Sequence, residues 1–259
     1  MKNSREECRV RLLGVDVDSV TESDLLERIY TLAHTDGKTI VAHTNVHSLN
    51  IAYHDKLFRS FFQMSTINFC DGAGVIAGAR LVGRRILERI TYADFMWHLA
   101  AFSSKKGMSM YFVGSLPGVS EKAKQKLKEE YPSLRILGAQ HGYFSKGFGH
   151  PENLQVVANI NSARPDLLIV GMGMPIQEHW VLENFERLDV KIILTGGAVF
   201  DYISGVVPRA PKWMTDHGLE WLGRMLIEPR RLWKRYLIGN PLFFWRIFIH
   251  HFLKVPLPR

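Results

Sequence analysis

Short apolar runs alternate with segments of helical periodicity along most of the chain. Runs with the length and composition of buried strands are residues 12–17, 39–43, 66–70, 108–113, 134–139, 166–170 and 191–194. Helical spacing of apolar residues marks 25–33, 94–102 and 120–131. Thr21 followed by Asp24 resembles a capping box at the entry to the first of these helices. The pattern predicts an α/β fold with a Rossmann-like, mostly parallel sheet flanked by helices.

The alternation ends at the sequence Pro-Arg-Ala-Pro (208–211). We therefore predict an α/β domain over residues 1–208 and an appendage over 209–259. The appendage has ten Lys and Arg against three Asp and Glu, so it carries +7 of the formal net charge of +8, and it holds four of the six tryptophans. Interleaved cationic and apolar positions predict a basic, amphipathic, helical appendage.

The remaining composition narrows the class of protein. No apolar run reaches the roughly 18 residues that a membrane-spanning helix needs. The first eleven residues are polar and do not resemble a secretion signal. Cys8 and Cys70 are the only cysteines, which excludes a disulfide framework and a cysteine-based zinc site. We predict a cytoplasmic protein.

Polar or glycine-rich residues follow four of the predicted strands, at 43–45, 71–74, 171–178 and 195–198. Ligands of open parallel sheets bind beyond the carboxyl ends of the strands, so these segments predict one nucleotide or phosphate cleft. Asp71 is the sharpest candidate, because a carboxylate there can accept a proton from a substrate. It can equally cap a helix that starts at Gly72, and both roles can hold at once. The two glycine loops would leave backbone N–H groups free to approach a phosphate.

Several other motifs predict no chemistry. The motif Asp16-Val17-Asp18 has the form of a metal-binding Asp-x-Asp, but it lies beside the first strand and is interpreted as a strand-end turn. Residues 36–39 resemble the end of a P-loop, yet they precede their strand and lack its first glycine. His250 and His251 are adjacent and do not share a helix face. Cys70 is interpreted as a packing residue.

The sequence resembles the WecG/TagA/CpsF family of bacterial glycosyltransferases over nearly its whole length. The resemblance rests on Asn45 and on segments 71–74, 88–90, 171–180 and 210–231. It implies transfer of a sugar from a UDP-sugar to a polyprenyl-diphosphate-linked saccharide, with inversion, in the synthesis of cell-surface polysaccharide or teichoic acid. It implies neither a cofactor nor a required metal. The donor sugar stays open among N-acetylmannosamine, its uronic acid and other hexoses.

The resemblance also assigns residues to roles. Asp71 takes the general-base position, and Arg89 and Gln177 fall near the donor diphosphate and sugar. Asn45 matches the asparagine of a Thr-x-Asn motif, in which this chain has His43 in the threonine position and a threonine at Thr44 instead. That departure leaves donor preference open. The implied donor-binding residues are Tyr143, Gly171, Gly173, Gly196, Gly197 and Asp201.

For the appendage, the resemblance implies closure over the active site and association with an anionic membrane surface at the inner face of the cell membrane. Arg224 and Arg231 match basic positions of the family. Lys234 stands in the place of a third arginine, and Arg235 beside it can substitute. These four residues would contact the acceptor's lipid diphosphate. Residues 242–253 predict an interfacial or partner-contacting helix, with a helix packed on its own domain as the alternative.

Two other function classes compete with this interpretation. A dinucleotide-dependent oxidoreductase needs Gly-x-Gly-x-x-Gly after the first strand, and residues 14–16 do not supply it. A nucleotide- or nucleic-acid-binding α/β protein could use the basic appendage, and would show salt-sensitive binding to polynucleotides. The transferase interpretation predicts UDP binding, lipid association and no nucleic-acid partner. The sequence leaves the oligomeric state open, including a homo-oligomer.

Overall fold

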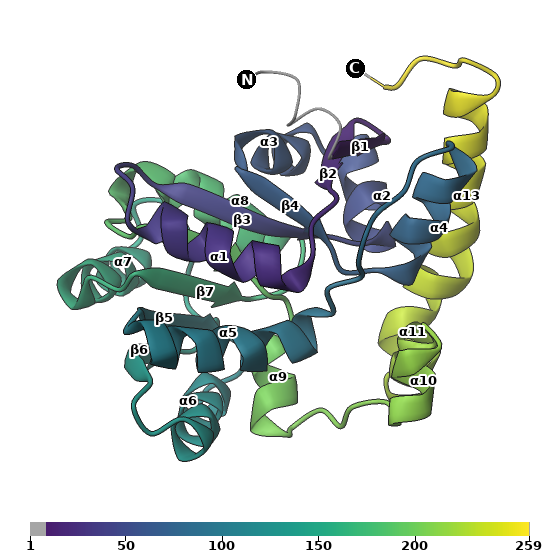
Figure 1. The fold of residues 1–259 in the computed structure, drawn as a ribbon. Coiled ribbons are helices and arrows are strands. Elements are labelled where there is room, and N and C mark those ends of the chain that lie inside the picture. Colours follow the sequence, from purple (N-terminus) through teal and green to yellow (C-terminus); the bar gives the residue numbers. More distant parts are fainter. Residues whose placement is uncertain (1–8, 259) are drawn as a thin grey trace.

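The computed structural model describes residues 9–258, and its centre is a single sheet (Figure 1). The strand order is β1-β2-β4-β3-β8-β7-β5-β6. Strand β1 is antiparallel to β2, and the other neighbouring pairs are parallel. The strands are β1 Arg9–Leu12, β2 Val15–Asp18, β3 Thr39–Thr44, β4 Ile67–Cys70, β5 Ser109–Gly114, β6 Arg135–Gln140, β7 Leu167–Gly171 and β8 Ile192–Thr195. The predicted fold class is confirmed.

The first predicted strand is wrong in one respect. Residues 12–17 are not one strand but the turn and inner ends of the β1–β2 hairpin. Leu13 and Gly14 form the turn with φ of +48° and +87°, which is the backbone twist of a two-residue hairpin turn. Apolar residues continue through this turn because both strands pack on the core, so the pattern hides the break.

Helices cover both faces of the sheet, each over its own apolar core. One face carries α1 Glu22–Ala33, α5 Tyr92–Lys106, α6 Val119–Glu130 and α9 Val199–Ser204. The other carries α2 Val46–His54, α3 Lys56–Met64, α4 Ala73–Leu81, α7 Pro151–Ala163, α8 Ile176–Asn184 and the short η1 Phe185–Arg187. The three helices predicted by periodicity are present. The hydroxyl of Thr21 accepts the N–H of Asp24 at 3.2 Å, as expected for the cap of α1.

The C-terminal segment turns back across the sheet end and along its side (Figure 1). It contains α10 Lys212–Asp216, α11 Glu220–Ile227, α12 Pro229–Trp233, the π-helical turn η2 Lys234–Ile238 and α13 Gly239–His251. Within the described residues, no helix is both long and apolar enough to cross a membrane. The division into a domain and an appendage stays a prediction.

Helix α13 packs on α2 and α4. Its Phe243 and Ile247 are buried in the apolar core on the face of the sheet that carries α2 and α4. A Cβ added to Gly78 of α4 would lie 2.8 Å from Cζ of Phe243, so the close approach of the two helices needs a glycine there. Arg246 donates to Oδ1 of Asn50 at 2.7 Å. The alternative interpretation of residues 242–253, packing on the chain's own domain, therefore holds for one face of this helix.

Candidate active site

A cleft of about 970 Å³ lies at the carboxyl edge of four adjacent strands, β4, β3, β8 and β7. One wall consists of the polar and glycine-rich residues that follow these strands. The opposite wall comes from α11, α12 and η2. The four strand-end segments therefore meet in one site, as predicted from the sequence. Residues of the opposite wall are Glu220, Trp221, Arg224, Glu228, Arg231, Leu232, Arg235 and Tyr236.

Asp71 lines this cleft at the end of β4. Its Oδ1 accepts the backbone N–H of Tyr92, the first residue of α5, at 3.0 Å. Its own N–H donates to the carbonyl of Thr44 at 2.9 Å. The carboxylate does not cap α4, because the N-cap of that helix is Gly72, which makes no side-chain cap. The N-cap interpretation of Asp71 is therefore wrong, and one carboxylate oxygen is held by α5 while the group faces the cleft.

The end of β3 sends alternate side chains in opposite directions. His43 and Asn45 line the cleft, whereas Thr44 is fully buried outside it. The structure thus does not bring Thr44 to the site. Asn45 is the N-cap of α2 in a full capping box with Ser48, so its amide oxygen is already occupied by the Ser48 N–H at 3.0 Å.

Gln177 holds the two glycine loops together from behind the cleft. Its Oε1 accepts the N–H of Gly173 at 3.2 Å and the N–H of Gly197 at 3.0 Å. The N–H of Gly196 donates to the carbonyl of Val170 at 2.8 Å. The expectation that these loops leave their N–H groups free is therefore wrong for Gly173, Gly196 and Gly197. Gln177 itself is fully buried and is not part of the cleft lining, so its direct contribution is to loop geometry.

Glu178 is a buried carboxyl group next to Gln177. Its Oε1 accepts the Nε2 hydrogen of Gln177 at 2.7 Å, while Oε2 has no hydrogen-bond partner among the described residues. Burial raises the pKa of Glu178 to about 8. The side chain is therefore neutral near pH 7, in contrast to a carboxylate in water.

Replacement of Glu178 by glutamine is expected to flatten the pH dependence of stability. Between its ordinary pKa of 4.5 and about 8, the folded wild type holds a proton that the unfolded chain has lost. Its free energy of unfolding therefore falls as pH rises through this window, by at most about 1.4 kcal/mol per pH unit. Urea unfolding at pH 5, 7 and 9 checks this. A constant difference between wild type and Glu178→Gln across the three pH values would contradict it.

The predicted donor-binding residues all line the cleft. Tyr143 is exposed, with 66% of its surface accessible, and lines the cleft from the loop after β6. Gly171, Gly173, Gly196 and Gly197 line it after β7 and β8. Asp201 of α9 accepts the hydroxyl of Ser115 at 3.2 Å, and burial raises its pKa. An exposed aromatic face beside glycine loops can receive a flat base.

The predicted basic residues divide into two groups. Arg89, Arg224, Arg231 and Arg235 line the cleft, whereas Lys234 is exposed and does not. Arg89 donates to the carbonyl of Thr215 at 2.7 Å, and Arg231 pairs with Glu228. Among the described residues, Arg224 and Arg235 form no salt bridge, and the Nε of each is buried without a hydrogen-bond partner.

Glu220 and Tyr202 are among the acidic and aromatic cleft residues that sequence reasoning missed. Glu220 lies opposite Asp71, and burial followed by the negative charge of Asp71 raises the pKa of Glu220. Tyr202 of α9 lies beneath the guanidinium of Arg224, whose Cζ is 5.2 Å from the ring centre. Glu220 stands in the segment that carries the family resemblance, which was the available signal. Tyr202 directly follows Asp201 in the chain, but no feature of the sequence marked it as a site residue.

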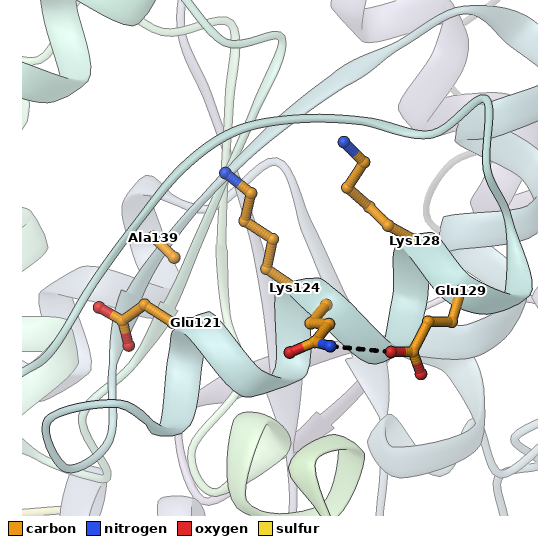
Figure 2. A pocket seen from close by; sticks show the side chains of 6 residues that line it. Glu121, Lys124, Lys128, Glu129 and Ala139 are labelled. Carbon is orange, nitrogen blue, oxygen red and sulfur yellow. Dashed lines mark hydrogen bonds between the residues drawn. The ribbon is translucent and has the colours of Figure 1, made fainter.

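A second hollow of about 540 Å³ has the character of a solvated helix face. It lies along α6 beside Ala139 of the edge strand β6. Figure 2 shows the side chains of Lys124 and Lys128 extending from the helix, with Glu121 near Ala139. These charges are distributed along one helix rather than converging from several elements, so the hollow supports no binding site.

Two of the motifs set aside in the sequence have structural roles. Residues 16–18 lie within strand β2, so their interpretation as a strand-end turn is wrong. Asp18 of β2 accepts the N–H of Asn68 and the Nε of Arg9, each at 2.7 Å, and so joins neighbouring strands. Cys70 is a buried free thiol, and Cys8 lies outside the described residues. No group of three or more His, Cys, Asp or Glu side chains in the described range has the arrangement of a metal site.

Comparison with known proteins gives one consistent result. A family model described as "Glycosyl transferase WecG/TagA/CpsF family" matches residues 10–255. The N-acetylglucosaminyldiphosphoundecaprenol N-acetyl-beta-D-mannosaminyltransferase of Bacillus subtilis (strain 168) is 34% identical over 183 residues, 69% of this chain and 68% of that protein. The protein of the same name from Staphylococcus aureus (strain MRSA252) is 25% identical over 241 residues, 92% of each chain. The family match includes both walls of the cleft.

Proposed function

Since the chain belongs to the WecG/TagA/CpsF family of glycosyltransferases, we propose that it transfers a sugar from a UDP-sugar to a polyprenyl-diphosphate-linked saccharide. The names of the two relatives support an acceptor that ends in diphosphate-linked N-acetylglucosamine and a donor that carries N-acetylmannosamine. The uronic acid of N-acetylmannosamine and other hexoses are further candidate donor sugars. The product would enter cell-surface polysaccharide or teichoic acid synthesis.

One observation carries this proposal. Arg224 and Arg235 place two guanidinium groups in the cleft wall opposite Asp71, and neither has a carboxylate partner among the described residues. Both side chains are half-buried, and withdrawing a cation from water without a carboxylate partner is costly, so a site that keeps two of them is suited to a ligand of opposite charge. A guanidinium binds phosphate oxygens bidentately. The pair therefore fits a diphosphate, which both proposed substrates contain.

Asp71 supplies the base in the proposed step. An acceptor hydroxyl attacks the anomeric carbon while its proton passes to the Asp71 carboxylate. The bond from that carbon to the diphosphate oxygen breaks, and UDP leaves with the electron pair. A β-linked product from an α-linked donor requires inversion, which one direct displacement gives. Arg224 and Arg235 would stabilise charge that develops on the leaving or bound diphosphate.

The test is release of UDP by purified protein from a panel of UDP-sugars, each with and without a polyprenyl-diphosphate N-acetylglucosamine analogue. We expect release that depends on the acceptor and is limited to one or two donors. The same assay with a strong chelator checks whether a metal is needed, and unchanged turnover is expected. Failure to bind UDP at all would overturn the proposed function, and activity lost to chelator but restored by magnesium or manganese would overturn metal independence.

We further propose that α13 contacts the membrane through its outward face. Trp245, Phe248 and Phe252 are 57%, 45% and 52% exposed, at the i, i+3, i+7 spacing of one helix face. Aromatic side chains of this kind insert at a lipid interface, and nearby cations add about 1 kcal/mol each on an anionic surface. The opposite face is docked on α2 and α4, so the helix can lie flat without leaving the protein.

The double substitution Trp245→Ala/Phe248→Ala is expected to weaken sedimentation with phosphatidylglycerol vesicles about tenfold or more, because it removes two large apolar contacts. Leu154→Ala is the matched control, since Leu154 is a 42% exposed apolar residue on α7, at the other side of the molecule (Figure 1). These surface changes are preferable to deletion of residues 209–259, which would expose the core around Phe243 and Ile247. Equal sedimentation of both variants and wild type would contradict the proposed membrane contact of α13.

A further inference from the structure

We propose that His43 determines sugar specificity by accepting, through Nε2, a hydrogen bond from a hydroxyl or amide N–H of the sugar bound beside Asp71. This inference rests on the proposed glycosyl transfer and names a recognition contact within the same cleft. The sugar can belong to the donor or to the acceptor, and kinetics with each substrate distinguish the two.

The orientation of the imidazole is set by β8. Nδ1 of His43 lies 2.7 Å from the backbone carbonyl oxygen of Thr195. A carbonyl oxygen can only accept, so Nδ1 carries the hydrogen and donates it. In the neutral ring the other nitrogen, Nε2, then has a lone pair and no hydrogen. Nδ1 is occupied inside the sheet, and Nε2 is the ring nitrogen left for the cleft that His43 lines.

The surroundings of His43 keep the ring neutral. His43 is buried, with 4% of its surface accessible. Burial lowers its pKa, as do the positive charges of Arg224 and Arg235, whereas Asp71 and the Thr195 carbonyl act in the opposite direction. Burial is the largest of these effects, so the ring is a hydrogen-bond acceptor toward the cleft and not a cation paired with Asp71.

Tyr92 connects His43 to the proposed base. The two rings meet edge to face with centres 5.0 Å apart, and the backbone N–H of Tyr92 donates to Asp71. The hydroxyl of Tyr92 is buried and has no hydrogen-bond partner among the described residues, although Tyr92 also lines the cleft. A buried hydroxyl without a partner is costly and points to a polar group of a ligand or water at this place. The wall beside Asp71 thus offers an acceptor and an unsatisfied hydroxyl to a sugar.

The hydrogen bond to Thr195 does not require a histidine. Asparagine can place an N–H where Nδ1 lies and keep the bond to Thr195, but it has no atom at the Nε2 position. Glutamine reaches the Nε2 position but does not reproduce the Nδ1 bond. His43→Asn and His43→Gln therefore separate the structural nitrogen from the proposed functional one.

The experiment measures kcat and KM for donor and acceptor with wild type, His43→Asn and His43→Gln, using parent sugars and analogues that each lack one hydroxyl or the acetamido group. We expect His43→Asn to lower kcat/KM about tenfold for the parent sugar, as for one lost hydrogen bond. Against one analogue, wild type and His43→Asn should become equal, because the group that Nε2 binds is already absent. His43→Gln should recover part of the loss for the parent sugar. Thermal unfolding and UDP affinity verify that both variants fold.

A second readout uses the unmodified protein. The ¹⁵N resonance of His43 Nε2 should shift when the UDP-sugar and acceptor analogue bind, whereas UDP alone should leave it unchanged. The inference would be overturned if His43→Asn had wild-type kinetics and the Nε2 resonance did not shift on substrate binding. Turnover by the wild type would in that case leave the proposed function intact. Equal losses in both variants for every analogue would also overturn it, since that indicates a structural role. Absence of turnover in the wild type would overturn the proposed function itself.

Discussion

Asp71→Asn is expected to abolish sugar transfer, lowering kcat by a factor of roughly 10² to 10⁴, the contribution of a positioned general base. The asparagine oxygen can still accept the N–H of Tyr92, so the start of α5 should keep its geometry. An amide cannot take the proton from an alcohol nucleophile. UDP affinity should stay within about threefold of wild type, because a neutral amide removes no contact to the diphosphate. Single-turnover kinetics and UDP titration measure the two quantities.

Asp71→Ala serves as the matched control for the structural part of this side chain. It removes the base together with the acceptor for Tyr92, and should lower stability further by about 1 to 3 kcal/mol because a backbone N–H loses its partner. If transfer is lost equally in both variants while only Asp71→Ala is destabilised, chemistry and structure are separated. Substantial turnover by Asp71→Asn would rule out the general-base role.

The double variant Arg224→Gln/Arg235→Gln is expected to lower kcat/KM by roughly 10² to 10⁴. Each guanidinium would make charge-assisted hydrogen bonds to a diphosphate, worth about 1.5 to 3 kcal/mol apiece. Because neither arginine forms a salt bridge among the described residues, removing them should leave no carboxylate partner unpaired. The fold should therefore survive. Steady-state kinetics with donor and acceptor varied separately identifies the diphosphate that the pair serves.

Lys234→Gln is the control for this pair. Lys234 and Arg235 are neighbours on η2 and lose the same charge, but only Arg235 lines the cleft. Arg235→Gln alone should lower kcat/KM tenfold or more, whereas Lys234→Gln should change turnover of a soluble acceptor analogue less than twofold. Equal effects of the two substitutions would indicate a general electrostatic contribution instead of a directed contact.

Most of the fold followed from the sequence because apolar runs at the sheet centre are long and uninterrupted. The family resemblance seen in the motifs is confirmed by the match over residues 10–255. The hairpin at Leu13 and Gly14 was not predicted, since both of its strands are buried and the apolar run crosses the turn. Asp71 was found because it directly follows a strand, and strand ends can be read from a linear pattern.

The parts of the site that depend on side-chain direction could not be read in the same way. Placement of His43 in the cleft, with Thr44 outside it, follows from strand alternation only once the burial of β3 is known. The choice of Arg235 over Lys234 is visible only in the structure, because both residues follow Arg231 at a spacing that can share its helix face, and only Arg235 lines the cleft. The bonds from Gln177 to Gly173 and Gly197 join loops distant in sequence, and no local pattern encodes them.

The bridge made by Gln177 bears on the entropy of ligand binding. A single amide oxygen holds the loop after β7 and the loop after β8, so moving either loop away from Gln177 breaks a hydrogen bond. Flexible loops lose conformational freedom when they close on a ligand, and this opposes binding. Here that ordering is complete when the chain folds. The glycine-lined part of the cleft is therefore a preorganised surface for the nucleotide that we propose binds there.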